Sequence, residues 1–156
     1  MKISYYLPKC VLSNEELAHL YPGWTAEKIF LKTGIASRRV VDRSETALDM
    51  AEAAAKRLFE EYGVDVQSID FVLLCTQSPD YKLPTSACIL QKRLGLRKSV
   101  GALDYNLGCS GFVYGLALAK GLVVSGVAKS VLLITAETYS KYIHPMDKRS
   151  EERRVG

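Results

Sequence analysis

Short apolar runs alternate along the chain with longer segments whose apolar residues recur every three or four positions. A continuous apolar run lies at Phe71 to Cys75, and mostly apolar runs lie at Val100 to Leu107 and Val131 to Ala136. Such runs are typical of strands covered on both faces. The segments between them have helical periodicity, one from Pro84 to Leu94, which Gly95 ends, and one from Ser110 onward. This alternation predicts an α/β protein with a mostly parallel or mixed sheet.

The first part of the chain predicts smaller elements. We expect a strand at Ile3 to Tyr6, helices at 14–20 and 26–32, an extended segment at 35–41 and a helix from Ser44 to Tyr62. Ser13 and Thr25 are suited to cap the first two helices, and Gly34 and Gly63 to end the second and the third. One face of the long helix is apolar, with Leu48, Ala51, Ala55, Leu58 and Phe59. Residues 138–142 are expected to begin a turn or a helix.

The segment from Ser110 to Ala128 is apolar enough to raise the alternative of a membrane span, which needs about 20 such residues. Lys120 argues against it, because a lysine at the centre of a membrane helix costs about 2.5 to 3.5 kcal/mol. Repeated glycines also permit close packing against other elements. The segment therefore predicts a helix buried in a large core.

Cys109 stands where the strand from Val100 passes into this helix. Backbone N–H groups and the positive end of the helix dipole stabilise a thiolate at a helix N-terminus. We therefore interpret Cys109 as a nucleophile; the alternative is a small buried residue that fills a gap.

Composition and charge are those of an ordinary globular protein, with 48% hydrophobic residues, 24% charged residues and a net charge of +4. The positive charge is scattered, so nucleic acid is not an expected partner. Four cysteines, at positions 10, 75, 88 and 109, have no metal-ligand spacing. No signal peptide is evident at the N-terminus, which predicts reduced thiols in a cytoplasm. Cys75 and Cys88 are expected in the core, and Cys10 in a loop.

Four sequence blocks occur in the order found in one known family. They are Tyr6-Leu7-Pro8 with Val11 to Leu17, then Lys32-Thr33-Gly34-Ile35, then Leu83 to Ala87 with Leu90-Gln91 and Leu94-Gly95, and finally Gly108 to Phe112 with Gly115-Leu116. On these blocks the chain resembles the N-terminal half of a β-ketoacyl-acyl carrier protein synthase III, of the thiolase superfamily. The resemblance implies an α/β, thiolase-like fold, of which this chain forms the N-terminal half of a layered αβαβα architecture. In that architecture the helix from Ser110 lies between two sheets, and one half cannot supply both, so we expect part of this helix to be uncovered here.

The resemblance also implies an activity. Cys109 would take an acyl group from acyl-CoA and condense it with malonyl-acyl carrier protein, with loss of CO2, at the start of fatty acid biosynthesis. The implied partners are acyl-CoA, acyl carrier protein and a second copy of the complete protein. Coenzyme A thioester is a substrate, and no cofactor and no metal are expected. The family's catalytic His and Asn belong to the second half, and neither His19 nor His144 matches them, so we expect this truncated chain to be inactive in condensation.

Further site residues follow from the same resemblance. The family has a Trp that stacks on the adenine of CoA where this chain has Lys28, and its basic motif residue corresponds to Lys32. Trp24, one helical turn upstream, is a candidate substitute, so Trp24, Lys28 and Lys32 form the expected CoA contact. Each has an ordinary alternative, as a partly buried Trp or as solvated lysines. Leu83 occupies the position that reaches across the dimer into the partner's acyl pocket, or it only packs at that interface.

Residues 149–156 differ from what the family would place there and match the in-frame translation of a common sequencing-library adapter. We expect residues 1–148 to form the N-terminal half-domain and 149–156 to be a non-native tail. The alternative is a natural, solvated charged tail.

Two other functions remain open. One is a ketosynthase III-like acyltransferase of specialised metabolism, which acts on a carrier-bound acyl group. The other is a non-catalytic ketosynthase-like partner subunit, against which Cys109 argues.

Overall fold

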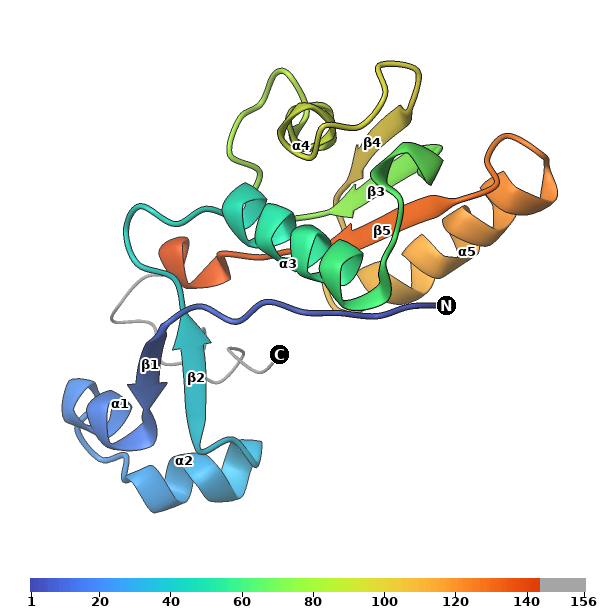
Figure 1. The fold of residues 1–156 in the computed structure, drawn as a ribbon. Helices are drawn as coiled ribbons and strands as arrows, with labels where there is room; N and C mark the ends of the chain where they lie inside the picture. The colour runs from blue at the N-terminus through green and yellow to red at the C-terminus, as the bar shows by residue number, and fades with distance from the viewer. Residues whose placement is uncertain (144–156) are drawn as a thin grey trace. The chain divides into compact units, whose positions relative to one another are not determined.

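The computed structural model describes residues 1–143 (Figure 1). The chain divides into two compact units. The first contains residues 1–6 and 46–137, and the second contains residues 7–45 together with the chain from Thr138. Each unit is described by itself. The predicted tail at 149–156 and His144 lie outside the described residues.

A parallel sheet forms the centre of the first unit. Its strands are β3 (Phe71–Cys75), β4 (Gly101–Tyr105) and β5 (Val131–Thr135), in the order β4-β3-β5. Cys75, the last residue of β3, is opposite Tyr105 on one side and Thr135 on the other. The three apolar runs are thus strands, as predicted, although β4 ends at Tyr105 rather than Leu107.

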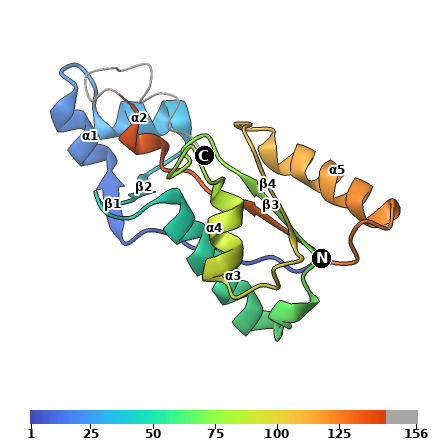
Figure 2. The ribbon, with the colours of Figure 1, turned by 90° about the horizontal axis from the view of Figure 1, so that it is seen from above.

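Helices cover both faces of this sheet (Figure 2). α3 (Ala47–Tyr62) and α4 (Ser86–Arg93) pack on one face, and α5 (Gly111–Val124) packs against β3 and β5 on the other. Buried side chains of the first face include Leu48, Val72, Leu74, Leu90 and Leu132. The α5 face includes Leu73, which is fully buried.

α4 connects β3 to β4, and α5 connects β4 to β5. These two helices lie on opposite faces of the sheet because the chain reverses its direction across the sheet. It moves from β3 outward to β4 through α4, and then back past β3 to β5 through α5. Strand-helix-strand crossovers between parallel strands are right-handed in nearly all proteins. Moves in opposite directions therefore place α4 and α5 on opposite sides.

The long helix begins later than predicted. Ser44 was expected to open it, but the N-cap is Thr46, whose side chain accepts the N–H of Asp49 while the Asp49 carboxylate accepts the N–H of Thr46. This reciprocal capping box needs an acceptor three residues after the cap, which Ser44 does not have. The Ser44 hydroxyl instead donates to Asp42 at 2.7 Å. The predicted end is confirmed, since Gly63 has φ +57°.

α4 also differs at its start. The prediction placed Pro84 at the first helical position, but the helix begins at Ser86, and the side chain of its N-cap Thr85 makes no capping hydrogen bond. The carboxylate of Asp104 takes that role. It accepts the N–H of Ser86 and the N–H of Ala87, each at 2.6 Å.

The predicted strand at Ile3 to Tyr6 is wrong, since residues 1–8 have no regular secondary structure. Its backbone hydrogen bonds go to side chains of α3 instead of to a neighbouring strand. The Tyr62 hydroxyl donates to the carbonyl of Ile3 at 3.0 Å, and Arg57 donates to the carbonyl of Tyr5 at 3.2 Å.

The second unit contains a two-stranded antiparallel sheet and two short helices. They are β1 (Cys10–Ser13), β2 (Ser37–Val40), α1 (Asn14–Leu20) and α2 (Ala26–Thr33). Cys10, predicted in a loop, is the first residue of β1. The other local predictions are confirmed, because Ser13 and Thr25 cap the two helices and Gly34 ends α2 with φ +70°. The small core is Leu17, Tyr21 and Ile29.

Two short 3-10 helices complete the described chain, at Val66–Ser68 and Tyr139–Lys141. The second agrees with the turn or helix expected near 138–142. Within residues 1–143, no helix combines the length and the apolar character that a membrane crossing requires.

Candidate functional site

The connections that leave the carboxyl ends of the three parallel strands carry most of the polar residues of interest. Gln77 and Ser78 follow β3, Cys109 follows β4, and Glu137 follows β5. The chain leaves β3 toward one face of the sheet and leaves β4 toward the other. Such a switch point, outside the carboxyl ends of adjacent parallel strands, is where open α/β sheets bind ligands.

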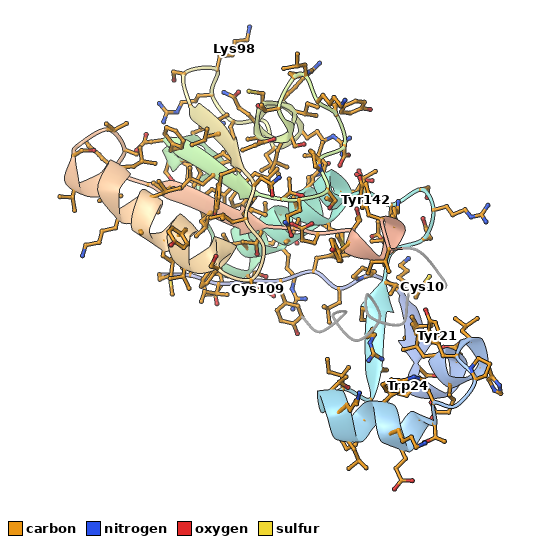
Figure 3. All side chains as sticks on the ribbon, turned by 180° about the vertical axis from the view of Figure 1, so that it is seen from behind. Cys10, Tyr21, Trp24, Lys98, Cys109 and Tyr142 are labelled. Carbon is orange, nitrogen blue, oxygen red and sulfur yellow. The ribbon has the colours of Figure 1, made fainter. Side chains whose placement is uncertain are left out.

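Cys109 lies in the turn between β4 and α5, and its side chain is exposed (Figure 3). The N–H of Gly111 donates to the carbonyl of Gly108 at 2.8 Å, which closes the turn around Cys109. The N–H of Tyr114 then donates to the carbonyl of Ser110 at 3.0 Å, in the first turn of the helix. The thiol thus lies just before the N-terminus of α5, as the sequence predicts, and it is accessible to a substrate.

The segment around Cys109 contacts the ends of β3 and β4. The Cys75 thiol donates to the carbonyl of Leu107 at 3.2 Å, and the Tyr105 hydroxyl donates to the carbonyl of Gly111 at 2.8 Å. A methyl group at Gly108 would lie 3.2 Å from the side-chain oxygen of Gln77. The turn that carries Cys109 is therefore held by contacts with the ends of β3 and β4.

Glu137 joins the connection after β5 to the connection after β3. One carboxylate oxygen accepts the N–H of Gln77 at 2.6 Å, and the other accepts the hydroxyl of Ser78 at 2.9 Å. Burial raises the pKa of the Glu137 carboxyl, while these two hydrogen bonds lower it. Glu137 thereby fixes the backbone at Gln77, whose side chain lies against Gly108.

The three residues expected to contact CoA lie together on α2 and the loop before it. Trp24, Lys28 and Lys32 line one groove of about 330 Å³, together with Gly23 and Leu31. The Lys32 ammonium lies 4.7 Å from the centre of the Trp24 ring, within cation–π range. Lys28 donates to the carbonyl of Gly23 at 3.4 Å. An aromatic ring and two cations beside a groove can bind a planar, phosphate-bearing ligand.

Leu83 is 84% exposed, in the loop before α4. A single exposed apolar side chain is ordinary on a protein surface and does not by itself indicate a contact with another molecule. The role expected for it across a dimer is a proposal.

The remaining cysteines are divided between core and surface. Cys75 is buried, as predicted, whereas Cys88 is exposed and its prediction as a core residue is wrong. Position 88 lies on the outer side of α4, because Ala87 and Leu90 are the positions that face the sheet. Among the described residues, no cluster of three or more histidines, cysteines or carboxylates is placed to hold a metal ion.

α5 has a broad exposed apolar face. Only Gly111 and Gly115 of this helix are buried, in agreement with the expectation that one half of the fold leaves part of the helix uncovered. A shallow groove of about 400 Å³ runs along it between Tyr114 and Ser125. The exposed apolar residues of α5 are Phe112, Val113, Tyr114, Leu116, Leu118, Val123 and Val124. In the chain alone, α5 thus has a covering sheet on one side only.

The residues at the strand ends that hold the turn carrying Cys109 were not identified from the sequence. Tyr105, Gln77 and Glu137 were not singled out, because they belong to three different connections. Their one shared signal is that each stands at or just after the end of an apolar run.

Comparisons with known proteins agree with this fold. The family model described as 3-oxoacyl-[acyl-carrier-protein (ACP)] synthase III matches residues 103–152. The β-ketoacyl-[acyl-carrier-protein] synthase III of Caldanaerobacter subterraneus is 39% identical over 145 residues, which are 93% of this chain and 43% of that protein. A crystal structure of a 3-oxoacyl-(acyl-carrier-protein) synthase III has a TM-score of 0.93 at 59% identity, covering 96% of this chain and 44% of that one. The Aquifex aeolicus enzyme has a TM-score of 0.90 at 36% identity, covering 97% and 48%.

The chain spans less than half the length of the relatives that it matches. Its α/β fold is thiolase-like, as predicted, and agrees closely with the corresponding part of the solved enzymes. By sequence and by fold, the chain is therefore similar to slightly less than half of a β-ketoacyl-acyl carrier protein synthase III.

Proposed function

We propose that the whole protein is a condensing enzyme that starts acyl-chain synthesis, and that this chain supplies its nucleophile. The observation that carries the proposal is the place of Cys109. It is exposed, it follows a central strand, and it lies just before the N-terminus of α5. Relatives named as synthases of this kind match nearly the whole chain.

In the proposed reaction, the Cys109 thiolate attacks the carbonyl carbon of a short acyl-CoA. The carbon–sulfur bond to CoA breaks, CoA leaves as its thiolate and takes up a proton, and an acyl-cysteine remains. The backbone N–H of Cys109 is suited to stabilise the oxyanion formed in this step. Malonyl-acyl carrier protein then loses CO2, and its carbanion attacks the acyl-cysteine. The carbon–sulfur bond to Cys109 breaks, which releases β-ketoacyl-acyl carrier protein.

The groove at Trp24, Lys28 and Lys32 is the proposed contact for the nucleotide part of CoA. Lysines bind phosphate as point charges, and an indole face can stack on adenine. Leu83 is proposed to reach the acyl pocket of a second copy in a homodimer. Residues 1–148 are proposed to be one half-domain of this enzyme, which works without a cofactor.

A second candidate is an acyltransferase of specialised metabolism that takes its acyl group from a carrier protein. Lys28 favours it, because the family resemblance places a stacking Trp at this position. The Trp24 ring already has the Lys32 ammonium over it. A weaker contact with the adenine of CoA is compatible with an acyl donor that is bound to a carrier protein instead of to CoA.

The test is the formation of an acyl-enzyme in the full-length protein, followed by intact mass and peptide mapping. Acetyl-CoA should add one acetyl group, on Cys109. Cys109→Ala should abolish the adduct, while Cys88→Ala, which removes another exposed thiol, should retain it. An adduct on another residue, or none from either CoA or carrier-protein donors, would contradict the proposal.

A further inference from the structure

Cys75 and Tyr105 are directly opposite each other, as the last residues of the neighbouring strands β3 and β4. Both side chains lie on the sheet face that α5 covers, and both meet the first turn of that helix. A methyl group at Gly111 would overlap the Cys75 sulfur, and one at Gly115 would overlap the Tyr105 hydroxyl. The two glycines are one helical turn apart, so they provide the space that these two side chains fill.

Two hydrogen bonds from this pair bracket Cys109 in the sequence. The Cys75 thiol donates to the carbonyl of Leu107, two residues before Cys109. The Tyr105 hydroxyl donates to the carbonyl of Gly111, two residues after it. The backbone on each side of Cys109 is thus tied to the rigid end of a strand, although Cys109 itself is exposed.

Tyr105 is suited to remain in its donor form. Burial, and then the neighbouring Cys75 thiol, raises the pKa of Tyr105 to about 12, so its hydroxyl is protonated throughout the neutral range. Cys75 is only 3% exposed. A buried thiol is a weak donor to a carbonyl.

We propose that Cys75 and Tyr105 are positioning residues, which hold the turn that carries Cys109 in the geometry required for acyl transfer. This inference rests on the proposed role of Cys109 as the nucleophile. Neither residue touches the substrate. They act through the carbonyls of Leu107 and Gly111, and a small displacement of a reacting group is enough to slow a reaction severalfold or more.

The experiment measures the rate of Cys109 acylation in the full-length protein by rapid quench and intact mass, over a range of acetyl-CoA concentrations. Cys75→Ala and Tyr105→Phe each remove one donor and keep most of the packing. We expect the maximal acylation rate to fall about tenfold in each variant. The acetyl-CoA concentration that gives half the maximal rate should stay within about twofold, because the proposed CoA groove lies on α2.

Rescue separates positioning from simple packing. Cys75→Ser restores a donor at position 75 and should return the rate to within about threefold of the wild type. The double variant Cys75→Ala/Tyr105→Phe should lose less than the product of the two single losses, because both side chains hold one turn. Cys88→Ala and Tyr62→Phe are the matched controls, since they remove a thiol and a hydroxyl on the other helices, and their rates should be unchanged.

The outcomes distinguish this inference from the proposed function. Unchanged acylation rates in both single variants, or a Cys75→Ser variant as slow as Cys75→Ala, would overturn the positioning role. A wild-type protein that forms no acyl-Cys109 would instead overturn the proposed function. Alkylation of Cys109 by iodoacetamide in the same variants would then test the positioning directly, with a severalfold slower rate in Tyr105→Phe expected and an unchanged rate contradicting it.

Discussion

Asp104 on β4 caps the helix that begins at Ser86, eighteen positions earlier in the chain, through a hydrogen bond of 2.6 Å between its carboxylate and the N–H of Ser86. The same carboxylate accepts the N–H of Ala87. A negative charge at a helix N-terminus also interacts favourably with the helix dipole. A residue of the sheet therefore supplies what the local N-cap Thr85 does not.

Replacing Asp104 with Ala should destabilise the protein by about 1 to 2 kcal/mol, since the first turn of α4 loses its cap. Urea unfolding of the full-length protein measures the loss, and hydrogen exchange in the α4 peptides should become faster. Asp65→Ala is the control, because Asp65 caps only the short 3-10 helix at the surface. An equal loss in both variants would contradict this account of α4.

Iodoacetamide should label Cys109 faster than Cys10 or Cys88, although all three thiols are exposed. The expected reason is the place of Cys109 in the turn just before the N-terminus of α5. Buried Cys75 should react slowest. Time-resolved peptide mapping of the full-length protein measures all four rates. Equal labelling of the three exposed cysteines would show that Cys109 has no special reactivity.

Lys28→Trp should lower the Michaelis constant for acyl-CoA if CoA is the donor. Stacking of a base on an aromatic ring contributes about 1 to 3 kcal/mol, and each 1.4 kcal/mol is a factor of about ten in affinity. Lys28→Ala is the control that removes the ammonium without adding a ring. No change with CoA, together with activity on acyl-carrier protein alone, would favour the specialised-metabolism candidate.

Asp70 should make stability depend on pH in the acid range. Hydrogen bonds from the N–H of Lys129, from Arg97 and from the N–H of Ser130 lower the pKa of its carboxyl. A group with a lowered pKa in the folded state stabilises it above the unfolded value of about 3.9, and this stability is lost as the pH falls through the lowered pKa.

Urea unfolding of the wild type and of Asp70→Asn at a series of pH values tests this direction. The difference between the two midpoints should be largest above about pH 5 and should shrink as the pH falls below about 4. Glu60→Gln, which changes an exposed carboxylate of α3, should give a small and nearly constant difference. A difference between the urea midpoints of the wild type and Asp70→Asn that grows toward low pH would contradict a lowered pKa of Asp70 in the folded protein.

The chain by itself should not catalyse condensation, however native its fold. The family resemblance places a catalytic His and Asn outside it, and acid–base and electrostatic groups account for several orders of magnitude in rate. The exposed apolar face of α5 should also cause association or a molten state. Size-exclusion chromatography and a product assay with acyl-CoA and malonyl-acyl carrier protein measure both. Steady turnover by a soluble monomer of residues 1–148 would contradict this prediction.

The features that the sequence predicts well are those set by neighbouring residues. Ser13 and Thr25 cap their helices, and Gly34 ends one, because each bonds within a few positions of itself. The place of Cys109 is of the same kind, since it depends only on a strand that runs into a helix. Thr46 was also readable, because Asp49 follows it by three residues.

The errors come from interactions between distant segments. Residues 3–6 have the composition of a strand, but the carbonyls of Ile3 and Tyr5 bond to side chains 59 and 52 residues away. The start of α4 depends on Asp104, and the support of Cys109 depends on the register that brings Cys75 opposite Tyr105. Strand register is fixed by packing across the sheet, so a single sequence gives no direct sign of it.

The fit of the Tyr105 hydroxyl against Gly115 means that these two positions cannot change independently. A side chain at 115, even alanine, would overlap both the Tyr105 hydroxyl and the Leu133 side chain, and a smaller residue at 105 with Gly115 retained would leave a void beneath the helix. In related sequences the two positions should therefore vary together. A designer who transplants the Cys109 turn to another sheet would have to move the two glycines together with the side chains that lie against them, which are Cys75, Tyr105 and Leu133.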